Sequence, residues 1–411
     1  MKNKFLAVFL CVFFLFAVTA CSNGEDTVTV TNIHSEDEPI APIEGIVSTD
    51  MPKETRISVL AVGDNIPHDS VINTAKEDAA SDETYDFSKI YAGIADEVSA
   101  ADIAFINQES PVGGAALGIA GYPNFNAPNE MIEELIDIGF DVFNIANNHM
   151  LDKGEKGYVN TVEYFNTLPV TMIGGYTKSD YDSIRIVEKD GVKIAFLSYT
   201  TIVNEGHKND ISSTSQYIIP YADTEDITRH VTLAKEQADV VIVSMHWGSE
   251  GVFTVTNEQR KYAKLCADLG VDVVLGHHPH VVGDVEWVEG ESGNKTLVAY
   301  SLGNFCSSQL YSYNMVGEML KFDIVKSADG TLGIENVTVD PVVCHYKTDT
   351  SKKDNQNLHV RYEVRMYMMS DYTEELASSH GSQNWGRFTF NTLKEYLTSA
   401  NYANISEEFM K

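Results

Sequence analysis

ISVLAVGD, residues 57–64, is typical of a buried β-strand that ends in a polar turn, because an apolar run closes with Gly63-Asp64. Similar apolar runs of strand length recur along the chain at 102–106, 141–146, 193–199, 239–244, 272–275 and 296–300. Amphipathic stretches of helix length lie at 87–99, 129–138, 158–168, 223–237 and 257–269. Short strands that alternate with helices predict an α/β fold with buried sheets.

The N-terminal 55 residues have a different composition. Lys2 and Lys4 precede an apolar stretch, and together they predict a signal peptide over residues 1–20. Residues 18–21, Val-Thr-Ala-Cys, resemble the bacterial lipobox, whose cleavage leaves Cys21 to be lipidated; the alternative is an ordinary signal peptide that ends at a cysteine by chance. Residues 21–55 therefore predict a lipidated Cys21 and a flexible tether. We expect an extracytoplasmic protein, anchored to the bacterial cell membrane by its N-terminal lipid.

The overall composition bounds the class of protein. The chain has 411 residues and a formal net charge of −31, which argues against nucleic acid as a partner because that binding needs clustered Lys and Arg. Cys266, Cys306 and Cys344 show no paired spacing, so we expect buried free thiols and no disulfide framework. We place the main domain at residues 56–345 and a helical extension at 346–411, with helical patterns near 358–370 and 388–397.

Side chains that can bind metal ions follow the first two strands. Asp64 ends the first strand, and His68 lies four residues further on. Asn107 and Glu109 follow the second strand and share a face if the chain stays extended. The carboxyl ends of strands in open α/β sheets are where ligands bind. Each residue also has a structural explanation, since Gly-Asp is a turn signal and a carboxylate can cap a helix.

Asn147-Asn148-His149 follows the third strand, and Asp152 lies three residues further on. An amide oxygen is a neutral hard ligand, and a carboxylate can fix the tautomer of a neighbouring imidazole that donates a proton. His149 and Asp152 are therefore candidate catalytic residues and Asn148 a candidate ligand; the alternative is a loop of turn-forming Asn residues. His246 follows a strand of Val and Ile, where a lone histidine is more often structural.

Gly276-His277-His278-Pro279-His280 is the most specific element of the sequence. His278 and His280 are two residues apart, so both can point at one site. Imidazole suits Zn, Fe or Mn, whereas carboxylate and amide oxygens favour harder ions. The combined candidate ligands are numerous enough for two divalent metal ions. They are Asp64, Glu109, Asn148, His246, His278 and His280.

In order and spacing, the motifs over about 57–305 resemble those of the CapA family of bacterial poly-gamma-glutamate capsule synthesis proteins. That family is similar to the calcineurin-like metallophosphoesterases. The resemblance implies a four-layer α-β-β-α sandwich with a dinuclear metal site, to which a helical C-terminal segment is appended. The matching motifs are Gly63-Asp64, Asn107-Gln108-Glu109, Gly139-Phe140-Asp141, Ala146-Asn147-Asn148-His149, His246-Trp247-Gly248, Gly276-His277-His278-Pro279-His280-Val281 and Tyr300-Ser301-Leu302-Gly303-Asn304-Phe305.

The resemblance also implies a role for each matching residue. It makes Asp64 the first metal ligand, Glu109 the bridging carboxylate and Asn148 the ligand beside His149, which lies near the leaving group. His246, His278 and His280 complete the ligands, and His68, Asn107, His277 and Asn304 are further candidates. The superfamily begins with Asp-x-His, but Asn65 and Ile66 follow Asp64, so either one ligand is missing or His68 replaces it.

Three functions fit these observations. The first is a metal-dependent hydrolase at the cell surface, acting on a phosphoester or on a linkage of an envelope polymer such as poly-gamma-glutamate. The second is a non-catalytic accessory of a polymer synthase, which uses metal to bind carboxylates. The third is a solute-binding lipoprotein, which the single ligand-rich strand edge disfavours because such proteins place their site between two lobes.

Overall fold

A computed structural model of the chain describes residues 54–81, 84–207 and 211–400, all within one compact unit, residues 50–411. The predicted signal peptide, Cys21 and nearly all of the predicted tether lie outside the described residues. Among the described helices, none is long and apolar enough to cross a membrane.

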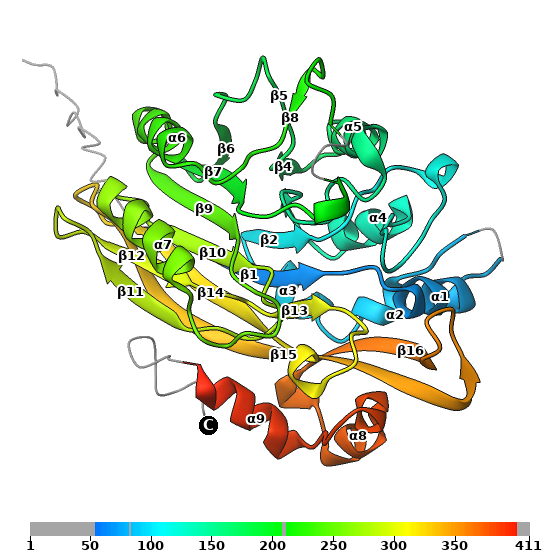
Figure 1. The fold of residues 1–411 in the computed structure, drawn as a ribbon. Helices are drawn as coiled ribbons and strands as arrows, with labels where there is room; N and C mark the ends of the chain where they lie inside the picture. The colour runs from blue at the N-terminus through cyan, green and yellow to red at the C-terminus, as the bar shows by residue number, and fades with distance from the viewer. Residues whose placement is uncertain (1–53, 82–83, 208–210, 401–411) are drawn as a thin grey trace, which may run out of the picture. The chain divides into compact units, whose positions relative to one another are not determined.

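Two mixed sheets make up most of the structure (Figure 1). In the larger sheet the order is β16-β15-β14-β1-β2-β3-β4, and β13 also pairs with β1. Its strands are β1 (Thr55–Asn65), β2 (Ile103–Gln108), β3 (Val142–Asn144), β4 (Thr171–Ile173), β13 (Asn304–Cys306), β14 (Val316–Lys326), β15 (Leu332–Lys353) and β16 (His359–Met368). The strands β1 to β4 are parallel, whereas β14, β15 and β16 extend the sheet in antiparallel fashion.

The smaller sheet has the order β11-β12-β10-β9-β7-β6, with antiparallel strands at both edges. Its strands are β6 (Arg185–Lys189), β7 (Val192–Thr200), β9 (Val240–His246), β10 (Val273–His277), β11 (Val285–Glu289) and β12 (Lys295–Ala299). A separate pair joins β5 (Tyr176–Thr177) and β8 (Tyr217–Ile218). Parallel strands β7, β9, β10 and β12 therefore end at a common edge.

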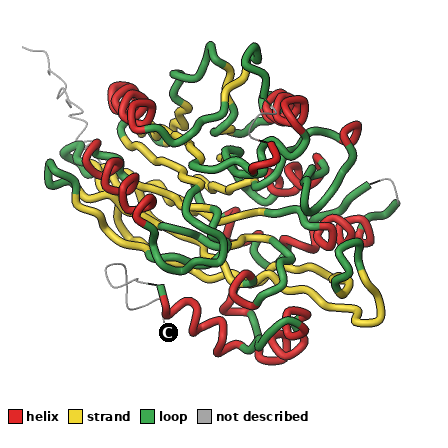
Figure 2. Tube along the Cα trace, viewed as in Figure 1, coloured by secondary structure: helices red, strands yellow, loops and turns green. Residues whose placement is uncertain are grey.

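Helices cover the outer faces of the two sheets (Figure 2). They are α1 (Asp69–Asp78), α2 (Ser88–Tyr91), α3 (Ala95–Ser99), α4 (Asn129–Asp137), α5 (Gly154–Phe165), α6 (Thr224–Gln237), α7 (Asn257–Leu269), α8 (Glu374–Ser379) and α9 (Phe390–Ser399). Local capping explains where the predicted helices begin and end. A capping box of Thr256 and Gln259 begins α7, and Gly270 at φ +76° ends it.

Because successive side chains of a strand point to opposite faces, the buried apolar side chains form three separate cores. In β1, Leu60 and Val62 face the helical side, whereas Val59 and Ala61 face the second sheet. In β9, Ile242 joins that inter-sheet core, and the side chains on either side of it pack beneath α6 and α7. The predicted four-layer α-β-β-α sandwich is confirmed. Each fully buried Val, Leu or Ile side chain in these cores contributes about 1.5–3 kcal/mol to the stability of the fold.

One predicted helix is wrong in the structure, and another is divided in two. The stretch 358–370 is the strand β16, in which Val364, Met366 and Met368 are buried at period two. The stretch 87–99 forms two short helices, because the backbone of Gly93 makes a bridge with Tyr367 of β16. A Cβ on that glycine would lie 2.3 Å from the carbonyl oxygen of Met366.

The predicted boundary after residue 345 falls inside β15, so the C-terminal part is not a purely helical appendage. Residues up to 368 complete the larger sheet, and in the described part of the chain after it lie α8, α9 and short 3-10 helices. The helical pattern near 388–397 corresponds to α9. Cys266, Cys306 and Cys344 are buried and free, as predicted.

Candidate metal centre

The metal-capable residues come from the carboxyl ends of strands in both sheets. Asp64 is the second-last residue of β1, Glu109 follows β2, and His246 is the last residue of β9. His278 and His280 follow β10 directly. The end of β1 is held against β13, because the Asp64 N–H donates to the Gly303 carbonyl at 2.9 Å. Gly63 permits this approach, since a Cβ there would lie 1.9 Å from that oxygen.

These side chains form two groups that share one carboxylate. One group is Asp64, Glu109 and His280, and the other is Glu109, His246 and His278. Within each group, one ligand atom per residue lies within 4.8 Å of the others. Because Glu109 belongs to both, the geometry fits a carboxylate placed between two cation positions.

Glu109 is fully buried, and its two carboxylate oxygens have no hydrogen-bond partner among the described residues. Its Oε1 lies 3.8 Å from His246 Nε2 and 3.6 Å from His280 Nε2, which is too long for a hydrogen bond. Burial, together with the neighbouring Asp64 charge, raises the pKa of Glu109 well above its usual range. Burying a carboxylate without a partner costs free energy. Imidazole nitrogens are common ligands of divalent metal ions, and they lie close to this carboxylate. The donor set therefore fits divalent cations.

Asp64 is held in a hydrogen-bond network. The Asn107 amide donates to Asp64 Oδ1 at 2.8 Å and accepts from the Asn144 amide at 2.8 Å. On its other oxygen, Asp64 Oδ2 lies 3.0 Å from His280 Nδ1. Burial acts to raise the pKa of Asp64, but its contacts with His277 and His280 outweigh this and hold the pKa well below the usual value. Asp64 is thus kept as an anion in a fixed orientation.

His278 and His246 are favoured in the neutral form, whereas burial opposes but contact with Asp64 raises the pKa of His280 above its usual value. Burial, with the nearby His280, lowers the pKa of His278 to about 3. Burial also lowers the pKa of His246 well below its usual value. Neutral imidazole is the form that binds metal. His278 Nδ1 has no hydrogen-bond partner among the described residues, so a ring nitrogen is left for a ligand.

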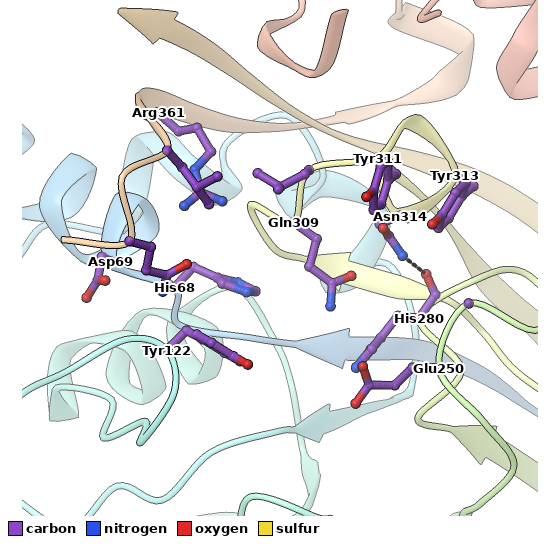
Figure 3. A pocket seen from close by; sticks show the side chains of 14 residues that line it. His68, Asp69, Tyr122, Glu250, His280, Gln309, Tyr311, Tyr313, Asn314 and Arg361 are labelled. Atoms are coloured by element: carbon purple, nitrogen blue, oxygen red, sulfur yellow. Dashed lines mark hydrogen bonds between the residues drawn. The ribbon is translucent and has the colours of Figure 1, made fainter. Parts of the chain in front are cut away.

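The backbone at this point is strained. His278 has φ +97° and His280 has φ +56°, a region that non-glycine residues rarely adopt. The two rings point toward one site because of these turns and not because of strand alternation, since β10 ends at His277. Asn314 holds the second turn, as its amide donates to the His280 carbonyl at 2.9 Å (Figure 3). Strain of this kind is typical of functional sites.

His149 and Asp152 form a close pair beside the two groups. His149 Nδ1 lies 2.7 Å from Asp152 Oδ2, an oxygen that also accepts from the Phe125 N–H at 2.8 Å. The ring of Phe125 meets the His149 ring edge-on, with centroids 4.7 Å apart. Asn148 faces His246, with 3.0 Å between Oδ1 and Nε2. This arrangement fixes the imidazole of His149 with its Nε2 on the far side from the carboxylate.

The further candidates lie around the groups, not in them. His277 packs in the inter-sheet core with its ring stacked on Phe105 at 5.6 Å, and its Nδ1 is 3.5 Å from Asp64 Oδ1. Asn304 of β13 pairs in register with Asp64 of β1. Its amide nitrogen is within hydrogen-bond distance of three acceptors, whereas its amide oxygen has no hydrogen-bond partner among the described residues. His68 Nδ1 accepts from the Ser308 N–H at 3.3 Å, and His68 shares a pocket with His280.

Asn65 and Ile66, which follow Asp64 where Asp-x-His would be completed, are both buried. The Asn65 amide donates to Gln108 at 2.7 Å and accepts from the Tyr91 hydroxyl at 3.0 Å. His68 belongs to none of the metal-capable groups among the described residues.

Sequence reasoning missed three residues at this centre. Glu250 forms a third metal-capable group with His278 and His280. Its signal was its place four residues after His246, in the loop where the chain leaves β9. Asn204 accepts from the Asn148 amide at 3.1 Å, and Asn314 holds His280. Asn204 lies in a loop and Asn314 ends a short 3-10 helix, and no spacing in the sequence relates either residue to the site.

The strain at position 278 predicts an unusual order of stability. We expect His278→Gly to be more stable than His278→Ala by about 1–2 kcal/mol, because glycine adopts positive φ without the clash that a Cβ brings. Urea denaturation of the metal-free variants measures the difference. His277→Gly and His277→Ala are the matched controls in β10, where alanine should be the more stable by roughly 0.5–1 kcal/mol. The same order at both positions would contradict the strain.

Comparison with known proteins places this arrangement in a family. Over residues 58–309 the chain matches the family described as bacterial capsule synthesis protein PGA_cap. It is 32% identical to PGA biosynthesis protein CapA of Bacillus subtilis over 229 residues, which are 55% of this chain and 57% of the relative. It is 27% identical to capsule biosynthesis protein CapA of Bacillus anthracis over 216 residues, 51% of each chain. The chain thus spans about half the length of each relative.

Among solved structures, a candidate 5′-nucleotidase from Staphylococcus aureus resembles the chain with a TM-score of 0.44 and 13% identity, over 74% of this chain and 57% of that one. The family match is the decisive comparison. It covers more than half of the chain and spans both metal-capable groups around Glu109. The chain therefore belongs to the bacterial capsule synthesis protein family PGA_cap.

Proposed function

We propose that the chain is a metal-dependent hydrolase that acts on an envelope polymer, such as poly-gamma-glutamate, during its synthesis or export at the cell surface. The observation that carries this is Glu109, a buried carboxylate without partners that two groups of metal-capable residues share. The names of the Bacillus relatives, which refer to capsule and PGA biosynthesis, support the polymer as the substrate class.

Two divalent ions of Mn, Fe or Zn type fit this set of nitrogen and oxygen donors. Asp64, Glu109 and His280 would hold one, and Glu109, His246 and His278 the other, with Asn148 beside His246. When bound, such a pair lowers the pKa of water and neutralises charge on entering and leaving oxygens.

The protein's own groups have separate tasks. The Nδ1–H of His149 donates to Asp152, which leaves Nε2 to hold a proton for the leaving group. The Phe125 N–H and ring keep Asp152 and His149 in place. The Asn107 amide keeps Asp64 turned toward the centre.

One observation favours a second candidate, a non-catalytic accessory of a polymer synthase that binds carboxylates through metal. Asn65 and Ile66 contribute nothing to the centre, because the first is hydrogen-bonded to Gln108 and Tyr91 and the second is buried. A centre that lacks one donor can still bind ions and anions.

Activity and metal content distinguish these candidates. We expect the purified protein to retain metal and to cleave γ-linked glutamate oligomers. Glu109→Gln should lose both, because it removes the shared charge. His149→Ala should keep its metal and lower kcat by about 10²–10⁴-fold, as expected for loss of a general acid. Elemental analysis and chromatography of the products measure these quantities.

Glu188→Gln, an exposed carboxylate on β6, is the control and should behave as the wild type. Metal binding without hydrolysis, together with loss of capsule in Glu109→Gln cells, would exclude the hydrolase and support the accessory. Purified protein that binds no metal after reconstitution would exclude both.

We further propose that Cys21 anchors the protein outside the cytoplasm, since it ends a lipobox-like segment. We expect Cys21→Ser to lose incorporation of labelled palmitate and to leave the membrane fraction, because each lipid methylene contributes roughly 0.8 kcal/mol of membrane affinity. Cell fractionation with Cys266→Ser as the control measures this. Equal lipid labelling of wild type and Cys21→Ser would contradict the anchor.

A further inference from the structure

A pocket of about 320 Å³ opens beside the metal-capable groups. His280 and Glu250 line one side of it, and His68 and Arg361 line the other (Figure 3). This volume lies at the lower end of the range for small-molecule sites, so the pocket can hold a short segment of a substrate.

Arg361 is the one Lys or Arg among the described residues that line this pocket. It comes from β16, and its side chain is only 8% exposed. Its Nη1 donates to the Ser308 carbonyl, and its Nη2 lies 3.2 Å from Asp354 Oδ2. The remaining donor, Nε, is buried and has no partner among the described residues. A buried guanidinium with an unpaired donor favours an anionic ligand.

The rim of the pocket carries exposed aromatic rings. Tyr122 is 51% exposed and Tyr311 is 49% exposed, and both line the pocket. Tyr311 stacks on Tyr313 with ring centroids 5.3 Å apart. Exposed aromatic side chains around a polar pocket are typical of a surface that binds a ligand.

We propose that this pocket binds an oxyanion group of the substrate, a carboxylate or a phosphate, through Arg361, while the bond to be cleaved lies at the His280 side. This rests on the proposed hydrolytic function and adds the residue that selects its substrate. The selecting part lies outside the family match, which ends at residue 309. The C-terminal strand β16, together with the tyrosines that follow β13, therefore sets which polymer the shared centre receives.

Asp354 competes with the ligand for the same guanidinium. Its Oδ1 accepts from the Gln356 and Leu358 N–H groups at 2.9 Å, which fixes the turn before β16. Asparagine can keep those two hydrogen bonds through its own Oδ1 while removing the negative charge from Arg361. Asp354→Asn therefore strengthens anion binding without loss of the turn.

The test is calorimetric binding to metal-loaded protein in a His149→Ala background, which slows turnover. The probes are γ-linked tetraglutamate, the same peptide with its side-chain carboxylates amidated, and inorganic phosphate. Arg361→Gln should weaken tetraglutamate binding by about 10-fold or more, as expected for a lost hydrogen bond to a charged group. Arg365→Gln on the same strand, where the arginine pairs with Asp78, is the matched control and should change binding less than twofold.

Asp354→Asn should bind tetraglutamate more tightly than wild type, which separates a binding role from a loss of folding in Arg361→Gln. The amidated peptide should bind weakly to every variant. If phosphate alone depends on Arg361, the oxyanion pocket is supported and phosphate is its ligand. Equal binding of tetraglutamate and phosphate to wild type and Arg361→Gln, or tight binding of the amidated peptide, overturns the proposal.

The outcome is independent of hydrolysis. Binding that depends on Arg361 in a protein that cleaves nothing would reject the hydrolase and keep the pocket. Cleavage that depends on Glu109 but not on Arg361 would keep the hydrolase and reject the pocket.

Discussion

The carboxylate of Glu109 is the constraint around which the centre is arranged. It is fully buried, lacks hydrogen-bond partners among the described residues, and is flanked by imidazoles from the ends of β9 and β10 in the smaller sheet. Such a group is unfavourable in a folded protein unless positive charge compensates it. The sandwich brings the ends of β2, β9 and β10 together at this point, and strained turns at His278 and His280 aim two rings at it. Fold and strain are both explained if cations occupy the space.

The sequence predicted much of the sandwich because its signals were local. The helices α6 and α7 carry their own caps, and β1 and β9 are apolar runs that end in polar residues. The strand β16 was missed because large, half-buried side chains such as Tyr362 and Tyr367 accompany its buried residues and hide the period of two. The break in the helix at 87–99 depends on a bridge from Gly93 to Tyr367, a contact far apart in the sequence.

At the site, too, residues with a local sequence signal could be predicted, whereas residues placed by contacts far apart in the sequence could not. Asp64, Glu109, His246, His278 and His280 could be named because each follows a strand, and the structure brings them together. Asn314 and Arg361 could not, because they act through loops and edge strands whose position depends on the completed sheet. The C-terminal region, predicted as an appendage, instead closes the pocket beside the centre.

Anomalous X-ray scattering from crystals of the protein loaded with manganese is the most direct test of whether Glu109 is shared by two metal ions. We expect two ions roughly 3.5–4 Å apart, both in contact with the carboxylate of Glu109, with His280 on one and His246 and His278 on the other. A single ion, no ion, or a Glu109 side chain that touches neither would contradict this expectation.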